Sequence, residues 1–336
     1  MRTRSLLVPS LALAGVLVAG CGSSGSSNSA GGSASGGSAA SGSACAPVAG
    51  DKLVVLEDDK HLQLADNVTP VVNAATAAAN PAVLPALDAV SAKLTTDELI
   101  KLNAAVDVDR KSATDVASGW VKDNDLTQGL QQGSGQVVVG AAPGTESTIL
   151  ANIYADVLKG AGFDASVQQA GGQREIYLPA LESGQLQVFP EYLATVTENL
   201  NKDINGPNAA QVATTDAQTT LAAVKPLAEQ KGLVFGTPSE AVDQNGFAVT
   251  TAFADKLDVT TLSQLADKCG DGSLTLGAGN ECPQRPFCQP GLEKTYGLKF
   301  ASFKPYDSGG PLTKAALMKG DVSLGLVLTS DGSLAQ

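Results

Sequence analysis

The nine residues Ala180–Val188, ALESGQLQV, are echoed by the nine residues Ala316–Leu324, ALMKGDVSL. In both stretches a helical run ends at a glycine, and polar and apolar residues then alternate into a strand. Glycine readily adopts the left-handed conformation in which many helices end, and alternation with a period of two is typical of a strand. The repeat predicts an α/β chain in which the two stretches occupy equivalent places in two similar lobes.

The same succession of helix and strand extends outward from both stretches. Around the first stretch we expect strands at 137–139, 165–169, 187–189 and 233–236, with helices at 146–160, 173–183 and 216–230. Around the second we expect strands at 247–250, 274–277 and 324–328, with helices at 261–267 and 312–319. Another strand is expected at 53–56, and helical structure at 82–127. Strands that alternate with helices predict mainly parallel sheets covered by helices on both faces.

The N-terminus has the pattern of an export signal. Two arginines within Met1–Arg4 precede the mostly apolar run Ser5–Leu17, which leads to Val18-Ala19-Gly20-Cys21. Such a run is too short to span a bilayer as a permanent helix. Small residues before a cysteine resemble the lipobox at which bacterial lipoproteins are cut and acylated. We expect a signal peptide at 1–20 and a lipid on Cys21, with an ordinary signal peptide as the alternative.

Residues 21–44 are expected to form a tether behind that lipid. After Cys21 the stretch contains only Gly, Ser and Ala apart from Asn28, a composition that forms a flexible coil. No later stretch approaches eighteen consecutive apolar residues. The lipid is therefore the expected membrane attachment, at the outer face of the bacterial cytoplasmic membrane.

Charge and side-chain composition favour a binding protein over an enzyme. Without Arg2 and Arg4 of the signal peptide, 20 basic residues stand against 34 acidic ones, and this net charge of −14 argues against nucleic acid as a partner. The single histidine, His61, lies in a charged run, and no motif of nucleophilic, phosphate-binding or zinc-dependent catalysis is present. Asp107 and Asp109 lack the glycine and the distal glutamate of a calcium loop. We expect no catalytic residue, no metal and no cofactor.

Four cysteines remain once Cys21 is assigned to the lipid. An even number in an oxidising compartment favours two disulfides, and the spacing matches no zinc module. Cys282 and Cys288 enclose a short loop with two prolines and Arg285, and a bond between them leaves Cys45 to pair with Cys269. A Cys269–Cys288 bond is the alternative.

Several long phrases resemble the substrate-binding proteins of ABC importers for quaternary amines, the glycine betaine, choline and carnitine class. They include GTESTILANIYADVL at 144–158, GGQREIYLPALESGQ at 171–185, RPFCQPGLEKTYGLKF at 285–300, DSGGPLTKAALMKGDV at 307–322 and LVVLEDDKHLQLADNVTPVV at 53–72. The resemblance extends from Leu53 to Leu334. It implies a type II periplasmic-binding-protein-like fold, in which two crossover strands join two α/β lobes around a cleft.

The order of these phrases is unusual for that family. The strand that contains Val137 corresponds to one near the mature start, whereas LVVLEDDK normally follows the phrase around Thr329. This order indicates a circular permutation in which the linker Gly129–Gly135 joins the old ends, a change that exposed neighbouring termini tolerate. The first lobe is then expected at 66–237, and the second at 45–65 plus 238–336.

The resemblance also implies which residues meet the solute. Thr145 opens a helix where free N–H groups can meet a carboxylate, and Arg285 corresponds to an arginine that holds the substrate carboxylate. The expected ligand-binding residues are Thr145, Tyr192, Thr195, Asp243, Asn245, Arg285, Asp66 and Thr329.

The aromatic cage of that family is largely missing here. Cationic head groups bind aromatic rings by cation–π attraction, and of those rings only Tyr192 is retained. Asn245, Leu328 and Asp66 stand where the family usually has aromatics, and Gly144 replaces another bulky residue. Phe287 and Tyr306 are further candidates for the cleft wall.

The resemblance therefore implies a lipid-anchored solute-binding protein of an ABC importer, with an osmoprotectant-like or amine- and carboxylate-bearing solute. A non-betaine polar solute, such as an amino-acid derivative or a polyol, and a sensory lipoprotein are the alternatives. The expected partners are the small solute, the permease and ATPase subunits, and the membrane through the Cys21 lipid. The protein itself is expected to be a monomer.

Overall fold

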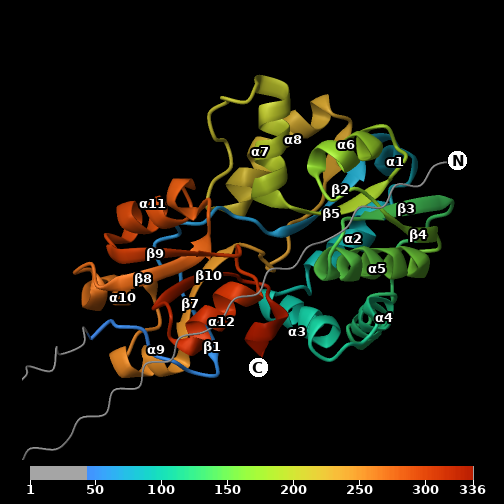
Figure 1. Cartoon of the computed structure of the whole chain (residues 1–336). Helices are drawn as coiled ribbons and strands as arrows, with labels where there is room; N and C mark the ends of the chain where they lie inside the picture. The colour runs from blue at the N-terminus through green and yellow to red at the C-terminus, as the bar shows by residue number, and fades with distance from the viewer. Residues whose placement is uncertain (1–43, 336) are drawn as a thin grey trace, which may run out of the picture. The chain divides into compact units, whose positions relative to one another are not determined.

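The computed structural model describes residues 44–335, and two five-stranded sheets organise them (Figure 1). The signal peptide expected at 1–20, Cys21 and the tether up to residue 43 lie outside the described residues. Within residues 44–335, no helix combines the length and the apolar character needed to cross a membrane.

Sheet I has the strand order β4-β3-β5-β2-β6. These strands are β2 (Val68–Asn73), β3 (Gln136–Ala141), β4 (Asp164–Gln169), β5 (Val188–Tyr192) and β6 (Leu233–Phe235). β3 runs parallel to β4 and β5, whereas β2 runs antiparallel to its neighbours β5 and β6. Along β2, Val68 and Val72 enter one hydrophobic core and Val71 enters another, as the twofold period of a strand requires.

Helices cover both faces of sheet I. The core that contains Val68 is shared with α2 (Val83–Ser91), α3 (Thr96–Asp107), α4 (Ala113–Asp123) and α5 (Thr145–Gly160). The core that contains Val71 is shared with α6 (Arg174–Glu182), α7 (Leu193–Asn205) and α8 (Ala217–Gln230). The short helix α1 (Ala74–Ala79) follows β2 directly. The region 82–127 is therefore helical as expected, although it is divided into three helices.

Sheet II has the order β1-β7-β10-β8-β9. Its strands are β1 (Leu53–Leu56), β7 (Asn245–Thr250), β8 (Leu274–Gly279), β9 (Phe300–Tyr306) and β10 (Leu324–Leu328). On one face lie α9 (Thr251–Leu257), α10 (Leu262–Cys269) and the turn η2 (Leu292–Tyr296), and on the other lies α12 (Pro311–Lys319). The shorter turns are η1 (Cys282–Gln284), α11 (Gln289–Gly291) and η3 (Gly332–Ala335).

The two sheets share one plan. In each, three neighbouring parallel strands are followed by an antiparallel strand and an edge strand: β2 and β6 in sheet I, β7 and β1 in sheet II. The repeated sequence units hold equivalent places, because Gly184 precedes β5 and Gly320 precedes β10, the third parallel strand of each sheet. Both glycines have φ near +75°, at 79° and 73°. The expectation of two similar α/β halves is confirmed.

Each antiparallel strand is reached by a crossover from the other sheet. Residues 57–67 lead from β1 to β2, and residues 236–244 lead from β6 to β7. The two crossovers lie side by side, since Asn67 and Val242 form an antiparallel bridge and the Asn67 amide donates to the Ser239 carbonyl at 2.8 Å. The amide N–H of Asp243 donates to the carbonyl of Asp66 at 3.2 Å.

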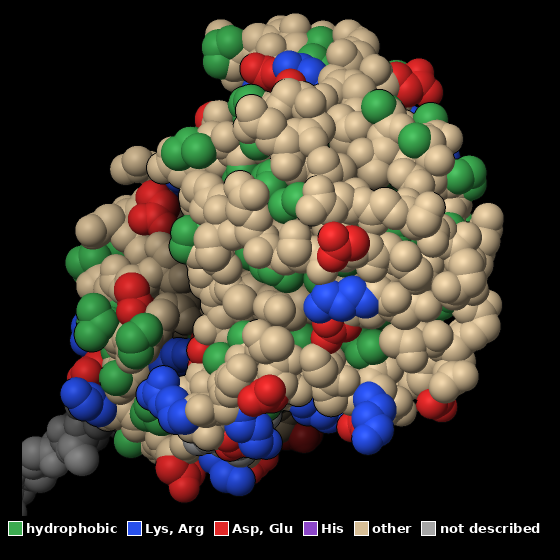
Figure 2. All heavy atoms as spheres, turned by 90° about the vertical axis from the view of Figure 1, so that its right-hand side faces the viewer, with side chains coloured by type: hydrophobic (Ala, Val, Ile, Leu, Met, Phe, Trp, Pro, Cys, Tyr) green, Lys and Arg blue, Asp and Glu red, His purple; other side chains and the backbone are tan. Residues whose placement is uncertain are grey.

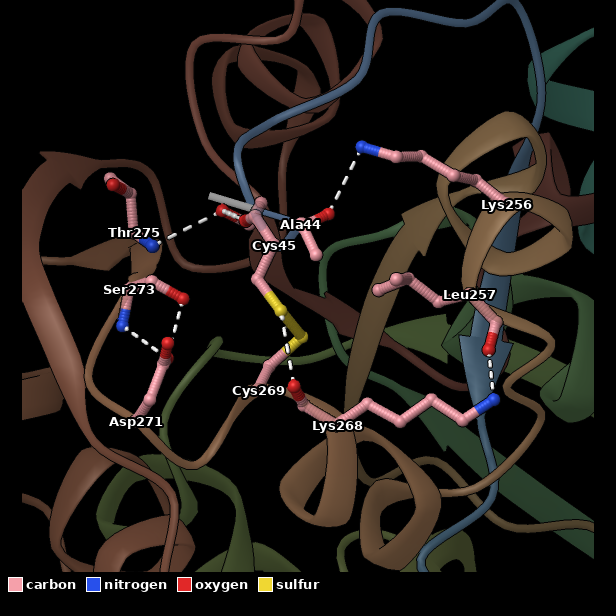
Figure 3. Close-up of a disulfide and its surroundings, with 10 residues drawn as sticks. Ala44, Cys45, Lys256, Leu257, Lys268, Cys269, Asp271, Ser273 and Thr275 are labelled. Atoms are coloured by element: carbon pink, nitrogen blue, oxygen red, sulfur yellow. Dashed lines mark hydrogen bonds between the residues drawn. A yellow bond between two sulfur atoms is a disulfide. The ribbon is translucent and has the colours of Figure 1, made fainter. Parts of the chain in front are cut away.

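Two disulfides stabilise the sheet II half, and they join the pairs expected from the sequence, Cys45 with Cys269 and Cys282 with Cys288. Figure 3 shows Cys45 bonded to the end of α10, with the Ala44 carbonyl accepting a hydrogen bond from Lys256 at 3.0 Å. All four cysteines are buried in the core of this half. The first described residues are thus fixed to sheet II.

The surface carries mixed charge on the face seen in Figure 2. Basic and acidic side chains are interspersed there, and neither sign forms a continuous patch. Among the described residues, the ion pairs Lys101–Glu98 and Lys159–Asp156 have exposed lysines, so they contribute little to stability.

The two disulfides predict unequal losses of stability. Cys45–Cys269 closes a sequence separation of 224 residues and Cys282–Cys288 one of 6. The entropy of closing those loops in the unfolded chain gives upper bounds of about 5 and about 2 kcal/mol. Urea unfolding of the paired Cys→Ala variants should therefore show the larger loss for Cys45 and Cys269. Equal losses, or a larger one for the short loop, would contradict this expectation.

Candidate functional site

Two cavities adjoin where the crossovers pass between the sheets. The first has a volume of about 700 Å³ and the second about 710 Å³, and Asp243 and Leu328 line both. We call the first the arginine cavity, because Arg174 and Arg285 line it, and the second the tyrosine cavity, because Tyr192 lines it. Residues from both halves of the fold and from the crossovers line each cavity.

Seven of the eight expected ligand-binding residues line these cavities. The arginine cavity is lined by Asp66, Thr195, Asp243, Asn245 and Arg285. The tyrosine cavity is lined by Thr145, Tyr192 and, again, Asp243.

Thr329 lines neither cavity. Its hydroxyl donates to the Val242 carbonyl at 3.2 Å and accepts from the Gln244 amide at 2.9 Å. The side chain therefore attaches the end of β10 to the second crossover. Of the two aromatic candidates, Phe287 lines the arginine cavity and Tyr306 lines neither.

Asp66 is held at the start of α7. Its carboxylate accepts the backbone N–H of Thr195 at 2.8 Å and a short hydrogen bond from the Thr195 hydroxyl. The first N–H groups of a helix lack partners within the helix and favour a negative charge, which explains this position. Burial raises the pKa of Asp66, and the two bonds from Thr195 oppose that rise.

Arg174, which sequence reasoning did not single out, lines the arginine cavity together with Asp66. Its guanidinium donates from Nε and Nη2 to one oxygen of Glu191, at 3.2 and 2.8 Å. The other oxygen of Glu191 accepts from the Tyr177 hydroxyl at 2.6 Å. Glu191 is buried in β5, and this pairing supplies the partners that a buried carboxylate needs. Arg174 therefore lines the cavity with its charge already paired.

A second network crosses from one sheet to the other. The Tyr192 hydroxyl makes a short hydrogen bond to Glu146, in the first turn of α5. The Asn103 amide of α3 donates to Glu146 at 2.6 Å and to the carbonyl of Ser330, after β10, at 2.8 Å. The Ser330 hydroxyl donates to Asp243 at 2.8 Å. Polar groups of five segments thus meet at the tyrosine cavity.

Asp243 is a carboxyl group of the cleft whose pKa is raised far above its ordinary value. Burial, followed by the nearby charge of Glu146, raises its pKa to about 7, and the hydrogen bond from Ser330 limits the rise. Burial and Glu146 also raise the pKa of Tyr192, which therefore stays a neutral hydrogen-bond donor. A carboxyl group that titrates near neutrality beside a neutral phenol suits recognition of a charged group.

Cationic side chains line both cavities, and Lys314, which lines the tyrosine cavity, is paired with Asp331. Arg285 follows η1 in the loop closed by Cys282–Cys288, and its exposed guanidinium lines the arginine cavity, as does Lys202 of α7. Thr145 instead donates to Asp107 at 2.6 Å. Within residues 44–335 no three His, Cys, Asp or Glu side chains are grouped so as to hold a metal ion. The described cleft can therefore bind a small charged molecule through side-chain hydrogen bonds and ion pairs.

Two of the residues missed by sequence reasoning lie inside the phrases quoted from the sequence. Arg174 and Glu146 each lie in the first turn of a helix that follows a strand after a short loop, which is a signal that sequence reasoning could have used. Asn103 lies in the interior of α3, and its role depends on how α3 packs against α5 and η3. No local pattern marks it.

A family model described as the substrate binding domain of ABC-type glycine betaine transport systems matches residues 46–123 and 135–336. The glycine betaine-binding protein YehZ of Escherichia coli (strain K12) is 28% identical over 211 residues, which are 61% of this chain and 67% of that protein. A crystal structure of a glycine betaine/carnitine/choline ABC transporter is 19% identical, with a TM-score of 0.45 over 60% of this chain and 70% of that one. The family model spans most of the chain, so the chain belongs to the substrate-binding domains of ABC-type glycine betaine transport systems, which bind solutes and are not enzymes.

Proposed function

We propose that this protein is the lipid-anchored, extracytoplasmic solute receptor of an ABC importer. Two lobes, residues 66–237 and residues 45–65 plus 238–336, would close over a solute and present it to the permease and ATPase subunits. The observation that carries the proposal is Asp243, which lies on a crossover and lines both cavities between the sheets. Closure about crossovers is the usual response of such a hinge to a ligand that contacts both sides.

We propose a solute with an amine and a carboxylate, and weak binding of glycine betaine. Tyr192 is the aromatic that the family pattern retains, and its hydroxyl is already bonded to Glu146. The positions of Asn245, Leu328 and Asp66 present an amide, an aliphatic chain and a carboxylate to the cleft. These groups favour charge-assisted hydrogen bonds over cation–π attraction.

Circular permutation remains part of the proposal. The family model matches in two blocks separated by residues 124–134, where most of the proposed linker lies. β3, which follows that linker, is the central parallel strand of sheet I, and β1 completes the edge of sheet II from the opposite end of the sequence. Both observations support an order in which the original ends were joined near residue 130.

The anchor is tested by changing Cys21 to Ala. We expect the variant to be released from membranes or to remain unprocessed, because acylation requires the thiol. Membrane fractionation and the intact mass of the mature protein measure this. A Cys21→Ala protein that is processed and stays membrane-bound like the wild type would show that another feature provides the attachment.

The solute class is tested by calorimetry with betaines, amino acids and polyols. Glycine betaine should bind weakly, and a preferred carboxylate solute should lose about thirty-fold in affinity, about 2 kcal/mol, in Arg285→Ala. Arg285→Lys is the matched control: it keeps the charge without the two-pronged donor and should recover only part of the loss. Low-micromolar binding of glycine betaine would contradict the assigned solute class while leaving the receptor role intact.

A further inference from the structure

The cavity junction holds more negative charge than the described side chains neutralise. Asp243 faces Glu146 from α5, Asp66 from the first crossover and Asp331 from the segment after β10. Lys314 of α12 pairs with Asp331, and Arg174 of α6 pairs with Glu191. In residues 44–335, no ion pair provides Asp243 or Glu146 with a cation. Arg285 and Lys202 line the arginine cavity and are absent from the walls of the tyrosine cavity.

The side chain of Asn103 independently indicates that a hydrogen-bond donor is missing at the tyrosine cavity. Its side chain is 5% exposed and lines the tyrosine cavity. The amide nitrogen serves Glu146 and Ser330, but the carbonyl oxygen Oδ1 has no hydrogen-bond partner among the described residues. A buried acceptor without a donor is destabilising, and an N–H group of a ligand would offset that cost.

We propose that Asp243 keeps a proton while the cleft is empty and releases it to solvent when the solute places an N–H-bearing ammonium group beside it. The proposal rests on the proposed function, since it requires the cleft to bind a small solute. One O–H bond of the carboxylic acid breaks, its proton goes to water or buffer, and the ammonium takes over as the positive partner. Oxygen Oδ1 of Asp243 keeps its bond from Ser330, which leaves Oδ2 for the ammonium.

The chemistry selects the class of amine. A quaternary ammonium has charge but no N–H, so it cannot satisfy the Asp243 carboxylate or the Asn103 carbonyl by hydrogen bonding. A primary, secondary or tertiary ammonium can donate to at least one of them. The site is therefore suited to amines that are not fully methylated.

The sign of the pH dependence follows from the raised pKa of Asp243. In the empty protein the carboxyl group is protonated below about pH 7, so a cation must displace a proton there. Affinity should fall about tenfold per pH unit below that midpoint and level off above it. Proton release per bound solute should approach one well below that midpoint and fall toward zero well above it.

The first experiment uses the empty mature protein and requires no ligand. Carbon-13 NMR of the aspartate carboxyl groups should show one titration near pH 7 that disappears in Asp243→Asn. Glu146→Gln removes a like charge and should move the midpoint down, whereas Ser330→Ala removes a stabilising donor and should move it up. Glu229→Gln, on the exposed side of α8 and away from the cleft, is the matched control and should leave it in place. An Asp243 titration below pH 5 would overturn the proposal.

The second experiment compares N,N-dimethylglycine with glycine betaine, which differ by one N-methyl group. Calorimetry in buffers of different ionisation enthalpy measures affinity and proton release together. We expect dimethylglycine to bind at least tenfold more tightly and to release protons as stated above. Equal affinities, or tight betaine binding without proton release, would overturn the exchange but leave the receptor function standing. If no amine, betaine, amino acid or polyol bound at pH 8, the proposed function itself would fail.

Discussion

The structure depends on the reciprocal exchange of one strand between its two sheets. β2 completes sheet I but arrives from β1 of sheet II, and β7 completes sheet II but arrives from β6 of sheet I. Neither sheet can complete its hydrogen bonding without a chain segment from the other half, so the two crossovers are forced to run together between the sheets. Their Asn67–Val242 bridge places Asp66 next to Asp243, although 177 positions separate these two residues in the sequence. The position of the site is thus a consequence of the topology.

Much of this architecture is predictable from local patterns. Runs such as Val137–Val139 and Leu324–Leu328 became strands, and the amphipathic run that begins at Glu146 became most of α5. β2 was not among the strands expected from the sequence, and it contains Pro70, although proline is rarely tolerated in a central strand. In the structure Pro70 lies directly opposite Pro190, and its carbonyl accepts from the Gly236 amide at 2.8 Å, so the pairing accommodates both prolines. The position of Pro70 in β2 is therefore explained by its pairing with β5 and not by the local sequence.

Sequence phrases predicted most of the residues that line the candidate site but not how their side chains are bonded. Family phrases placed seven residues in the cleft, whereas the supporting role of Thr329 follows from the distance between β10 and the second crossover. The balance of charge around the two cavities could not be predicted from the sequence either, because it depends on which carboxylates are paired with a cation in the folded protein. Glu191 is paired with Arg174 and Asp331 with Lys314, whereas burial and then the unpaired charge of Glu146 raise the pKa of Asp243. Burial determines the strength of these effects as much as charge does.

The Cys45–Cys269 bond also determines how mechanical load enters the folded protein. A pull applied through residue 44 reaches Cys45 and passes across the disulfide into the end of α10, so β1 and the crossover behind it are shielded from the tension. The sheet I half has no covalent attachment to the point of load except through the two crossovers. Tension applied at Cys45 is therefore carried by the sheet II half, and the crossovers and the two cavities lie outside its path.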